Sequence, residues 1–81
     1  MPILSEKIDG KNIIVEIKSS NIKSANYNTD SEKLTITFNT GSIYEYAKVP
    51  WNKFTKFRLS ESQGKFFNEQ IAKNHTYTKV K

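Results

Sequence analysis

The sequence predicts an α+β fold, in which a small antiparallel β-meander of three to four strands is followed by two short helices packed on one face. Residues 12–49 hold short runs of β-branched and aromatic residues that are separated by turn-forming residues. After Pro50 the apolar residues recur every third or fourth position instead of every second. A chain of 81 residues is long enough for one small domain, which we expect to span residues 1–81.

The strands of the meander are expected between turn clusters. Residues 12–18 are rich in β-branched side chains, and residues 22–28 form a weaker second strand. Residues 34–39 alternate, which places Leu34, Ile36 and Phe38 on one face. After a turn at 39–41, residues 42–49 return along that strand. We expect residues 1–17 to contribute an extra N-terminal strand.

The loop length at the 39–41 turn decides which way Tyr44 and Tyr46 point. A two-residue loop would place Glu45 opposite Ile36, in the core, whereas a three-residue loop places the tyrosines there and Glu45 in solvent. The three-residue loop needs a positive φ only at Gly41, and it avoids a buried carboxylate that would cost several kcal/mol. The sequence therefore favours two inward tyrosines.

Two helices are expected after Pro50, which can occupy the first turn of a helix. Trp51, Phe54 and Phe57 lie on one side of the first helix, with Arg58 near Trp51 at the edge of that side. Ser62 is a candidate N-cap for a second helix over residues 63–73, and Asn74 can end it. The tail 75–81 alternates, and it either adds an edge strand or frays.

The net charge of +5 is concentrated in the second half of the chain. Residues 1–47 carry five lysines and six acids (−1), whereas residues 48–81 carry eight basic residues and two acids (+6). Lysines often serve only to keep a small protein soluble. The asymmetry nevertheless favours an anionic partner for the second half.

Several function classes are disfavoured by the composition. The chain has no cysteine and only one histidine, His75, which we expect to be solvated near a helix end. We therefore predict no metal site, no cofactor and no catalytic residues, and hence no enzyme. No apolar run is long enough to span a membrane, and the first residues lack the pattern of a secretory signal. We expect a cytoplasmic protein without a membrane partner.

The best candidate for a binding surface combines basic and aromatic residues in the helical region. Such a combination holds single-stranded nucleic acid, because cations follow the phosphates while rings stack on bases. Phe54, Phe57 and Phe67 are more simply explained as core, whereas Trp51 and Tyr77 are left open between core and ligand contact. The predicted nucleic-acid-binding residues are Lys48, Trp51, Lys53, Lys56, Arg58, Lys65 and Lys73.

An ordered set of short motifs resembles the KTSC domain, the lysyl-tRNA synthetase C-terminal short domain. The matching elements are Ser19-Ser20-Asn21-Ile22, Tyr27, the L-x-I-x-F strand, Gly41-Ser42, Tyr44-x-Tyr46, Val49-Pro50 and Ser62-x-Gly64-x-Phe66-Phe67-Asn68-x-x-Ile71. The resemblance covers about residues 18–77. It implies a module that occurs at the C-terminus of some lysyl-tRNA synthetases and as free-standing bacterial or phage proteins, with RNA binding as a suggested role.

The family-motif residues are expected to be structural. They are Ser20, Asn21, Tyr44, Tyr46, Ser62, Gly64, Phe67 and Asn68. The function we expect is a small non-enzymatic binding module for tRNA-like or structured RNA. One alternative is a protein-interaction module, such as a phage factor acting on a host protein through the outer sheet face. Another is a binder of a small anionic ligand, such as a nucleotide, at Ser62, Gly64 and Lys65. The oligomeric state is left open.

Overall fold

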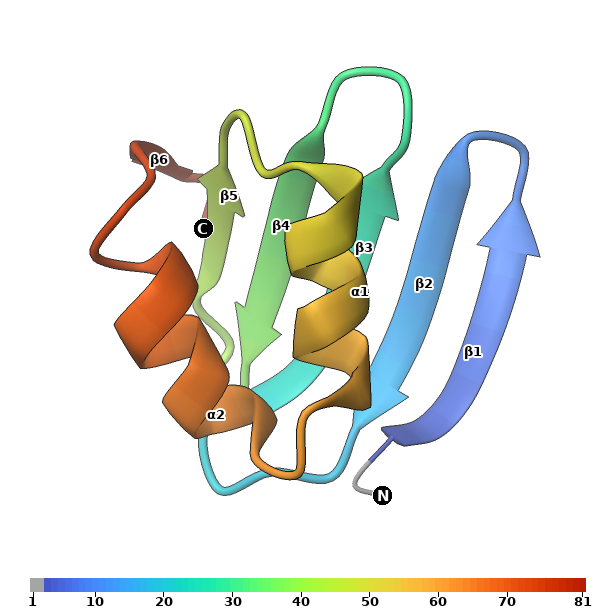
Figure 1. Cartoon of the computed structure of the whole chain (residues 1–81). Coiled ribbons are helices and arrows are strands. Elements are labelled where there is room, and N and C mark those ends of the chain that lie inside the picture. Colours follow the sequence, from blue (N-terminus) through green and yellow to red (C-terminus); the bar gives the residue numbers. More distant parts are fainter. Residues whose placement is uncertain (1–2) are drawn as a thin grey trace.

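A computed structural model describes residues 3–81 of the chain, and side-chain burial is described from Ser5 onward. Six antiparallel strands form one sheet in the order β1-β2-β3-β4-β5-β6, and both helices lie on the same face of it (Figure 1). The strands are β1 (Ile3–Asp9), β2 (Asn12–Ile17), β3 (Ile22–Asn28), β4 (Lys33–Phe38), β5 (Ile43–Tyr46) and β6 (Tyr77–Lys79). The α+β class and the antiparallel meander are therefore confirmed.

The expected number of three to four strands was too low, because strands are added at both edges of the sheet. Residues 3–17 form two strands, since β1 turns at Gly10 and pairs with β2. The strand β1 has a mostly polar sequence without clear alternation, and it forms a local hairpin with β2 through the two-residue loop Gly10-Lys11. The tail forms the edge strand β6 beside β5, which settles the choice between strand and fraying for residues 77–79.

The hairpin between β4 and β5 has the expected three-residue loop. The backbone N–H of Phe38 donates to the Ser42 carbonyl oxygen (2.9 Å), and Gly41 has a φ of 94°. Leu34 pairs with Tyr46, and Ile36 pairs with Tyr44. The tyrosines therefore share the inner face of the sheet with Leu34 and Ile36, as predicted.

The helices are α1 (Trp51–Leu59) and α2 (Gln63–Phe66), and α2 continues into the π-helical turn η1 (Phe67–Ile71). Pro50 is the N-cap of α1 and not part of its first turn, because its ψ of 154° is extended. Ser62 caps α2 as predicted, since its Oγ accepts a hydrogen bond from the Lys65 backbone N–H (3.4 Å). No helix among the described residues is long and apolar enough to span a membrane.

The core lies between the helices and the inner face of the sheet. Phe54 and Phe57 from α1, and Phe67 and Ile71 from η1, are buried against side chains of β2, β3, β4 and β5. The outer face is left uncovered by the described elements and carries Thr35, Thr37 and Ile43. Glu45 pairs with Thr35 on that outer face and forms an ion pair with Lys33 (3.5 Å), so it is solvent-facing as predicted.

Candidate functional site

Three of the predicted basic residues line the gap between the two helices. Lys53 and Lys56 of α1 face Phe66 of α2 and Gln70 of η1 across a hollow of about 290 Å³, which Asn52 completes. A second hollow of about 370 Å³ shares Phe66 and Gln70 with the first and adds Lys65. We call these two adjoining hollows the interhelical groove. Its cationic side chains are those of Lys53, Lys56 and Lys65.

Acidic side chains lie in the second half of this groove. Glu61 and Glu69 line the same hollow as Lys65, whereas no acidic residue in the described part of the chain lines the hollow with Lys53 and Lys56. Lys56 and Lys65 are both exposed, and within the described residues neither forms a salt bridge. The positive potential of the groove is therefore strongest between Lys53 and Lys56 and weaker around Lys65.

Arg58 and Trp51 contact each other on the other flank of α1. The guanidinium carbon of Arg58 lies 5.4 Å from the centroid of a Trp51 ring, and Nη1 donates to the Glu6 carboxylate of β1 (2.9 Å). Glu6 therefore offsets the Arg58 charge. Trp51 is half-exposed but packs against Tyr27 and Phe54 as well. The structure does not bring this pair together with the lysines of the groove.

The remaining basic candidates, Lys48 and Lys73, lie outside the groove. Lys48 is exposed in the loop between β5 and α1, with a φ of 55°. Lys73 is exposed in the turn after η1. The seven predicted residues therefore occupy at least three places on the helical side of the protein, and only Lys53, Lys56 and Lys65 share a concave surface.

His75 is not solvated as expected, because it is half-buried against Lys53. The two side-chain nitrogens, Lys53 Nζ and His75 Nε2, are 3.1 Å apart. Burial lowers the pKa of His75, the Lys53 charge lowers it further, and a backbone hydrogen bond at Ala47 partly opposes both effects. Neutral His75 can accept a hydrogen bond from the Lys53 ammonium at Nε2, which positions Lys53 at the groove.

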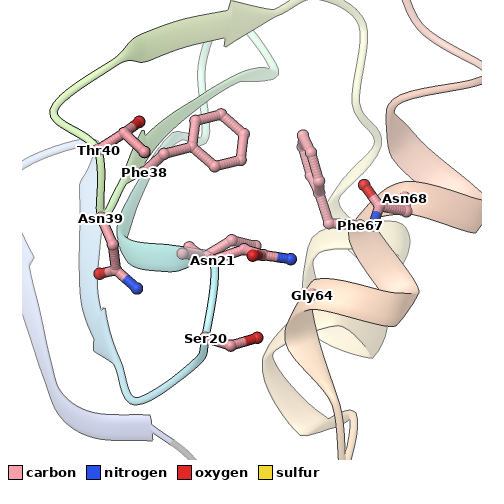
Figure 2. A pocket seen from close by; sticks show the side chains of 9 residues that line it. Ser20, Asn21, Phe38, Asn39, Thr40, Gly64, Phe67 and Asn68 are labelled. Atoms are coloured by element: carbon pink, nitrogen blue, oxygen red, sulfur yellow. The ribbon is translucent and has the colours of Figure 1, made fainter.

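The family-motif residues gather at a different place, around a cavity of about 190 Å³ beside the β4–β5 hairpin. We call it the hairpin pocket. Figure 2 shows Phe38 and Phe67 facing each other above Asn21, with the Ser20 hydroxyl directed toward Gly64. Three separate segments thus meet there: the β2–β3 loop, the β4–β5 hairpin and helix α2 with η1. The motif residues that line it are Ser20, Asn21, Gly64, Phe67 and Asn68.

Four further residues line the hairpin pocket, and sequence reasoning did not assign them to a site. Phe38 and Ile22 supply apolar surface, and the rings of Phe38 and Phe67 meet edge to face with centroids 5.6 Å apart. Asn39 and Thr40 belong to the hairpin loop, and Asn39 Nδ2 donates to the Ser19 carbonyl oxygen (2.9 Å). A turn signal predicts a loop, but it gives no indication of what the loop contacts.

Gly64 brings helix α2 close to the β2–β3 loop. A Cβ atom at Gly64 would lie 3.4 Å from Ser19 Oγ and 3.9 Å from Asn21 Nδ2. The helix and the loop are thus in contact, although an alanine there would meet both atoms at ordinary van der Waals distances. The contact between the helix and the loop therefore does not by itself require a glycine at position 64.

The motif residues Tyr44 and Tyr46 pack against the aromatic residues that line the hairpin pocket. Tyr46 is buried with its ring 5.1 Å from that of Phe67, and Tyr44 contacts Phe38 edge to face at 5.6 Å. Burial raises the pKa of Tyr46, and the neighbouring Tyr77 and Tyr44 raise it further. Tyr77 is exposed and packs on both tyrosines. The aromatic cluster therefore fixes the positions of Phe38 and Phe67.

Gln63 is a buried residue that the sequence analysis did not single out. Its Nε2 lies 2.9 Å from the Ser60 carbonyl oxygen, 3.1 Å from that of Arg58 and 3.4 Å from that of Phe57. These carbonyl groups lie at the C-terminal end of α1, where helices leave acceptors without intrahelical partners. The side chain of Gln63 therefore joins the end of α1 to the start of α2.

No group of three or more potential metal-ligating side chains occurs within the part of the chain that the structure describes. The two concave surfaces are lined by lysines, carboxylates, amides, hydroxyls and aromatic rings.

The comparison with family models decides the classification of this chain. The model of the KTSC domain matches residues 18–77, which run from the end of β2 to the start of β6 and include both concave surfaces. The chain belongs to the KTSC family. The hairpin β1–β2 lies outside the matched residues.

A solved KTSC structure has the same fold. The crystal structure of a KTSC domain protein from Yersinia pestis superimposes with a TM-score of 0.78 at 30% identity, covering 82% of this chain and 93% of that one. Curated proteins similar to this KTSC chain include lysine–tRNA ligases. That of Nostoc sp. is 31% identical over 67 residues, which are 83% of this chain and 12% of the ligase. The chain thus spans about one eighth of that relative's length.

Smaller relatives match over most of their length. A protein of Stutzerimonas stutzeri is 28% identical over 61 residues, which cover 75% of this chain and 86% of the relative. The KTSC domain is therefore found both within large ligases and in short chains. This distribution is that of a small module that can stand alone or be attached to another protein.

Proposed function

We propose that this KTSC protein is a small, non-catalytic, cytoplasmic module that binds structured or tRNA-like RNA through the interhelical groove. The observation that carries the proposal is the meeting of Lys53 and Lys56 with Phe66 and Gln70 in one hollow without an acidic lining residue. Ammonium groups contact phosphates, while the half-buried Phe66 ring offers apolar surface to a base or ribose.

Two further observations support this function. Residues 48–81 carry a charge of +6, so the half of the chain that contains both helices attracts a polyanion. Three of the similar curated proteins are named lysine–tRNA ligases, and tRNA is a substrate of those proteins. A module attached to such a ligase would act on the same RNA by raising its local concentration.

The contact with His75 holds the Lys53 side chain in a defined position in the groove. A lysine that is held in place loses less side-chain entropy when it contacts a phosphate. Lys56 and Lys65 are exposed and can adapt to the backbone of the RNA. Arg58 is excluded from the proposed surface because Glu6 and Trp51 already occupy its guanidinium.

The test is a salt titration of binding to bulk tRNA. Wild-type protein should bind more weakly as salt rises, with a log–log slope of about 0.7–0.9 for each phosphate contact. The double variant Lys56→Gln/Lys65→Gln should lose affinity and have a smaller slope. The variant Lys7→Gln/Lys23→Gln is the matched control, because it removes the same charge from exposed positions on β1 and β3.

Three results would contradict the proposal. Binding that does not change with salt, or no binding at low salt, would exclude an RNA-binding groove. Equal losses in the two double variants would show that net charge and not the groove controls binding. Capture of a specific protein together with absent RNA binding would favour the interaction-module alternative.

A further inference from the structure

Among the residues that the structure describes, no charged side chain lines the hairpin pocket. Its polar groups are hydroxyls and amides, chiefly Ser20, Asn21, Thr40 and Asn68, and its apolar groups include the rings of Phe38 and Phe67. A phosphate, carboxylate or ammonium group would find no opposite charge among these residues. The lining therefore fits an uncharged ligand that has both a ring surface and hydrogen-bonding edges.

The amides of Asn21 and Asn68 are available for such a ligand. Both residues are exposed, and among the described residues neither side chain makes a hydrogen bond. An asparagine amide offers donors and an acceptor side by side, which is the arrangement that pairs with the edge of a nucleobase. Asn39, by contrast, already uses its amide N–H₂ on the Ser19 carbonyl oxygen.

The size of the pocket limits what can enter. Its volume of about 190 Å³ is below the range of roughly 300–1,000 Å³ for pockets that enclose whole drug-sized ligands. One ring system can therefore be enclosed, while a sugar and phosphate must remain outside. The half-buried Phe38 ring offers apolar surface at the wall of the pocket, and the buried Phe67 ring packs against it edge to face (Figure 2).

Residues of α2 and η1 line both the hairpin pocket and the interhelical groove. Lys65 and Asn68 are three residues apart on α2 and η1, so their side chains occupy neighbouring positions on the helix surface. Asn68 lines the hairpin pocket, whereas Lys65 lines the interhelical groove. Only helix α2 therefore separates the hairpin pocket from the interhelical groove.

We propose that the hairpin pocket binds one unpaired nucleobase of an RNA whose backbone lies in the interhelical groove, an inference that rests on the RNA-binding function proposed above. The groove supplies affinity through phosphate contacts that carry no sequence information. The pocket supplies base contacts through Asn21, Asn68 and the Phe38 ring. In single-strand binding, cationic side chains contact the backbone and aromatic rings contact the bases. We assign these two roles to two different surfaces of this fold.

The test uses a single-stranded RNA of about ten nucleotides, in the size range of single-strand binding sites. Affinity is measured at one salt concentration for the normal oligonucleotide and for a series in which one nucleotide at a time is abasic. An abasic nucleotide keeps its phosphate, so the electrostatic contribution is unchanged. We expect one abasic position to weaken binding about tenfold, as expected for loss of one stacked base.

The protein variant Asn21→Ala/Asn68→Ala should bind the normal oligonucleotide about as weakly as wild type binds the abasic one. Its salt slope should equal that of wild type, because no lysine is changed. Asn74→Ala is the matched control, since Asn74 is an exposed asparagine beyond η1 that does not line the pocket. It should leave the affinity unchanged.

Different experimental outcomes would contradict the inference about the hairpin pocket and the RNA-binding function of the groove. If wild type binds RNA with a salt slope but the abasic series and the double asparagine variant bind equally well, the pocket inference is overturned and the groove stands. If wild type does not bind RNA at all, both are overturned. Chemical-shift changes at the Gly64 and Asn68 amides on adding adenosine or uridine would support the pocket, and their absence would count against it.

Discussion

The Tyr27 hydroxyl donates a 2.7 Å hydrogen bond to the Val49 carbonyl oxygen, and both residues are fully buried. This contact joins the third strand of the sheet to the segment that leads into α1. The Tyr27 ring stacks on Phe54 of α1, with centroids 4.4 Å apart and planes 8° apart. The position of α1, and with it that of Lys53 and Lys56, therefore depends on one tyrosine.

Replacing Tyr27 with phenylalanine should lower the free energy of unfolding by about 1–2 kcal/mol, because the Val49 carbonyl oxygen would lose its side-chain partner inside the core. Urea unfolding measures this loss. Tyr44→Phe is the control, since the half-buried Tyr44 hydroxyl makes no hydrogen bond among the described residues. Equal losses in the two variants would show that the Tyr27 hydrogen bond has no special role.

Replacing Gln63 with glutamate should lower the free energy of unfolding by about 1–3 kcal/mol, because a buried carboxylate cannot donate to the carbonyl groups at the end of α1. The negative end of the α1 dipole disfavours the charge as well. Gln70→Glu places the same change at an exposed position of η1 and should have little effect. A stable Gln63→Glu variant at pH 7 would contradict the capping role.

Lowering the pH should destabilise the wild-type protein through His75. Burial and the Lys53 charge lower the pKa of His75 in the folded state, so the unfolded chain binds the proton more readily. The contribution to stability is complete above the unfolded pKa of about 6.5 and is lost as the pH falls from there through the folded pKa. Urea unfolding between pH 7 and pH 5 measures this dependence.

The variant His75→Gln isolates that effect, because glutamine can accept a hydrogen bond from Lys53 but does not titrate. Its stability should change less between pH 7 and pH 5 than that of wild type. Parallel pH profiles for the two proteins would mean that other groups are responsible for the acid sensitivity.

Replacing Gly41 with alanine should destabilise the protein by about 1 kcal/mol, because the φ of 94° is strained for any residue with a Cβ atom. The hairpin pocket should be perturbed too, since Thr40 and Asn39 belong to the same loop. Gly10→Asn is the control, as its φ of 60° lies in the left-handed region that asparagine tolerates. No difference between the two variants would argue against the assigned loop geometry.

The register of the β4–β5 hairpin was predictable because its determinants are local. The alternation of Leu34, Ile36 and Phe38 and the glycine at position 41 leave one register that keeps Glu45 out of the core. The cap at Ser62 and the buried faces of the helices follow from equally short patterns. Each of these features is decided by residues within about one turn or one hairpin of each other.

The strands at the edges of the sheet were harder to predict from short sequence patterns. Strand β1 carries Glu6 on the side that faces α1, where it bonds with Arg58, 52 residues later in the chain. From the sequence alone, a charged residue at such a position is predicted to be exposed to solvent. Its partner becomes visible only when the strand and the helix are placed together.

Short residue patterns were enough to predict the central meander, the two helices, the inward direction of Tyr44 and Tyr46 and the concentration of positive charge after residue 47. Which charges act together became clear only from the packed fold. It placed Lys53 and Lys56 in one hollow, removed Arg58 from that surface and joined Ser20, Asn21, Phe38 and Asn68 around one cavity. The physical reason is that turns and alternation act between neighbouring residues, whereas grooves and cavities arise where distant segments pack.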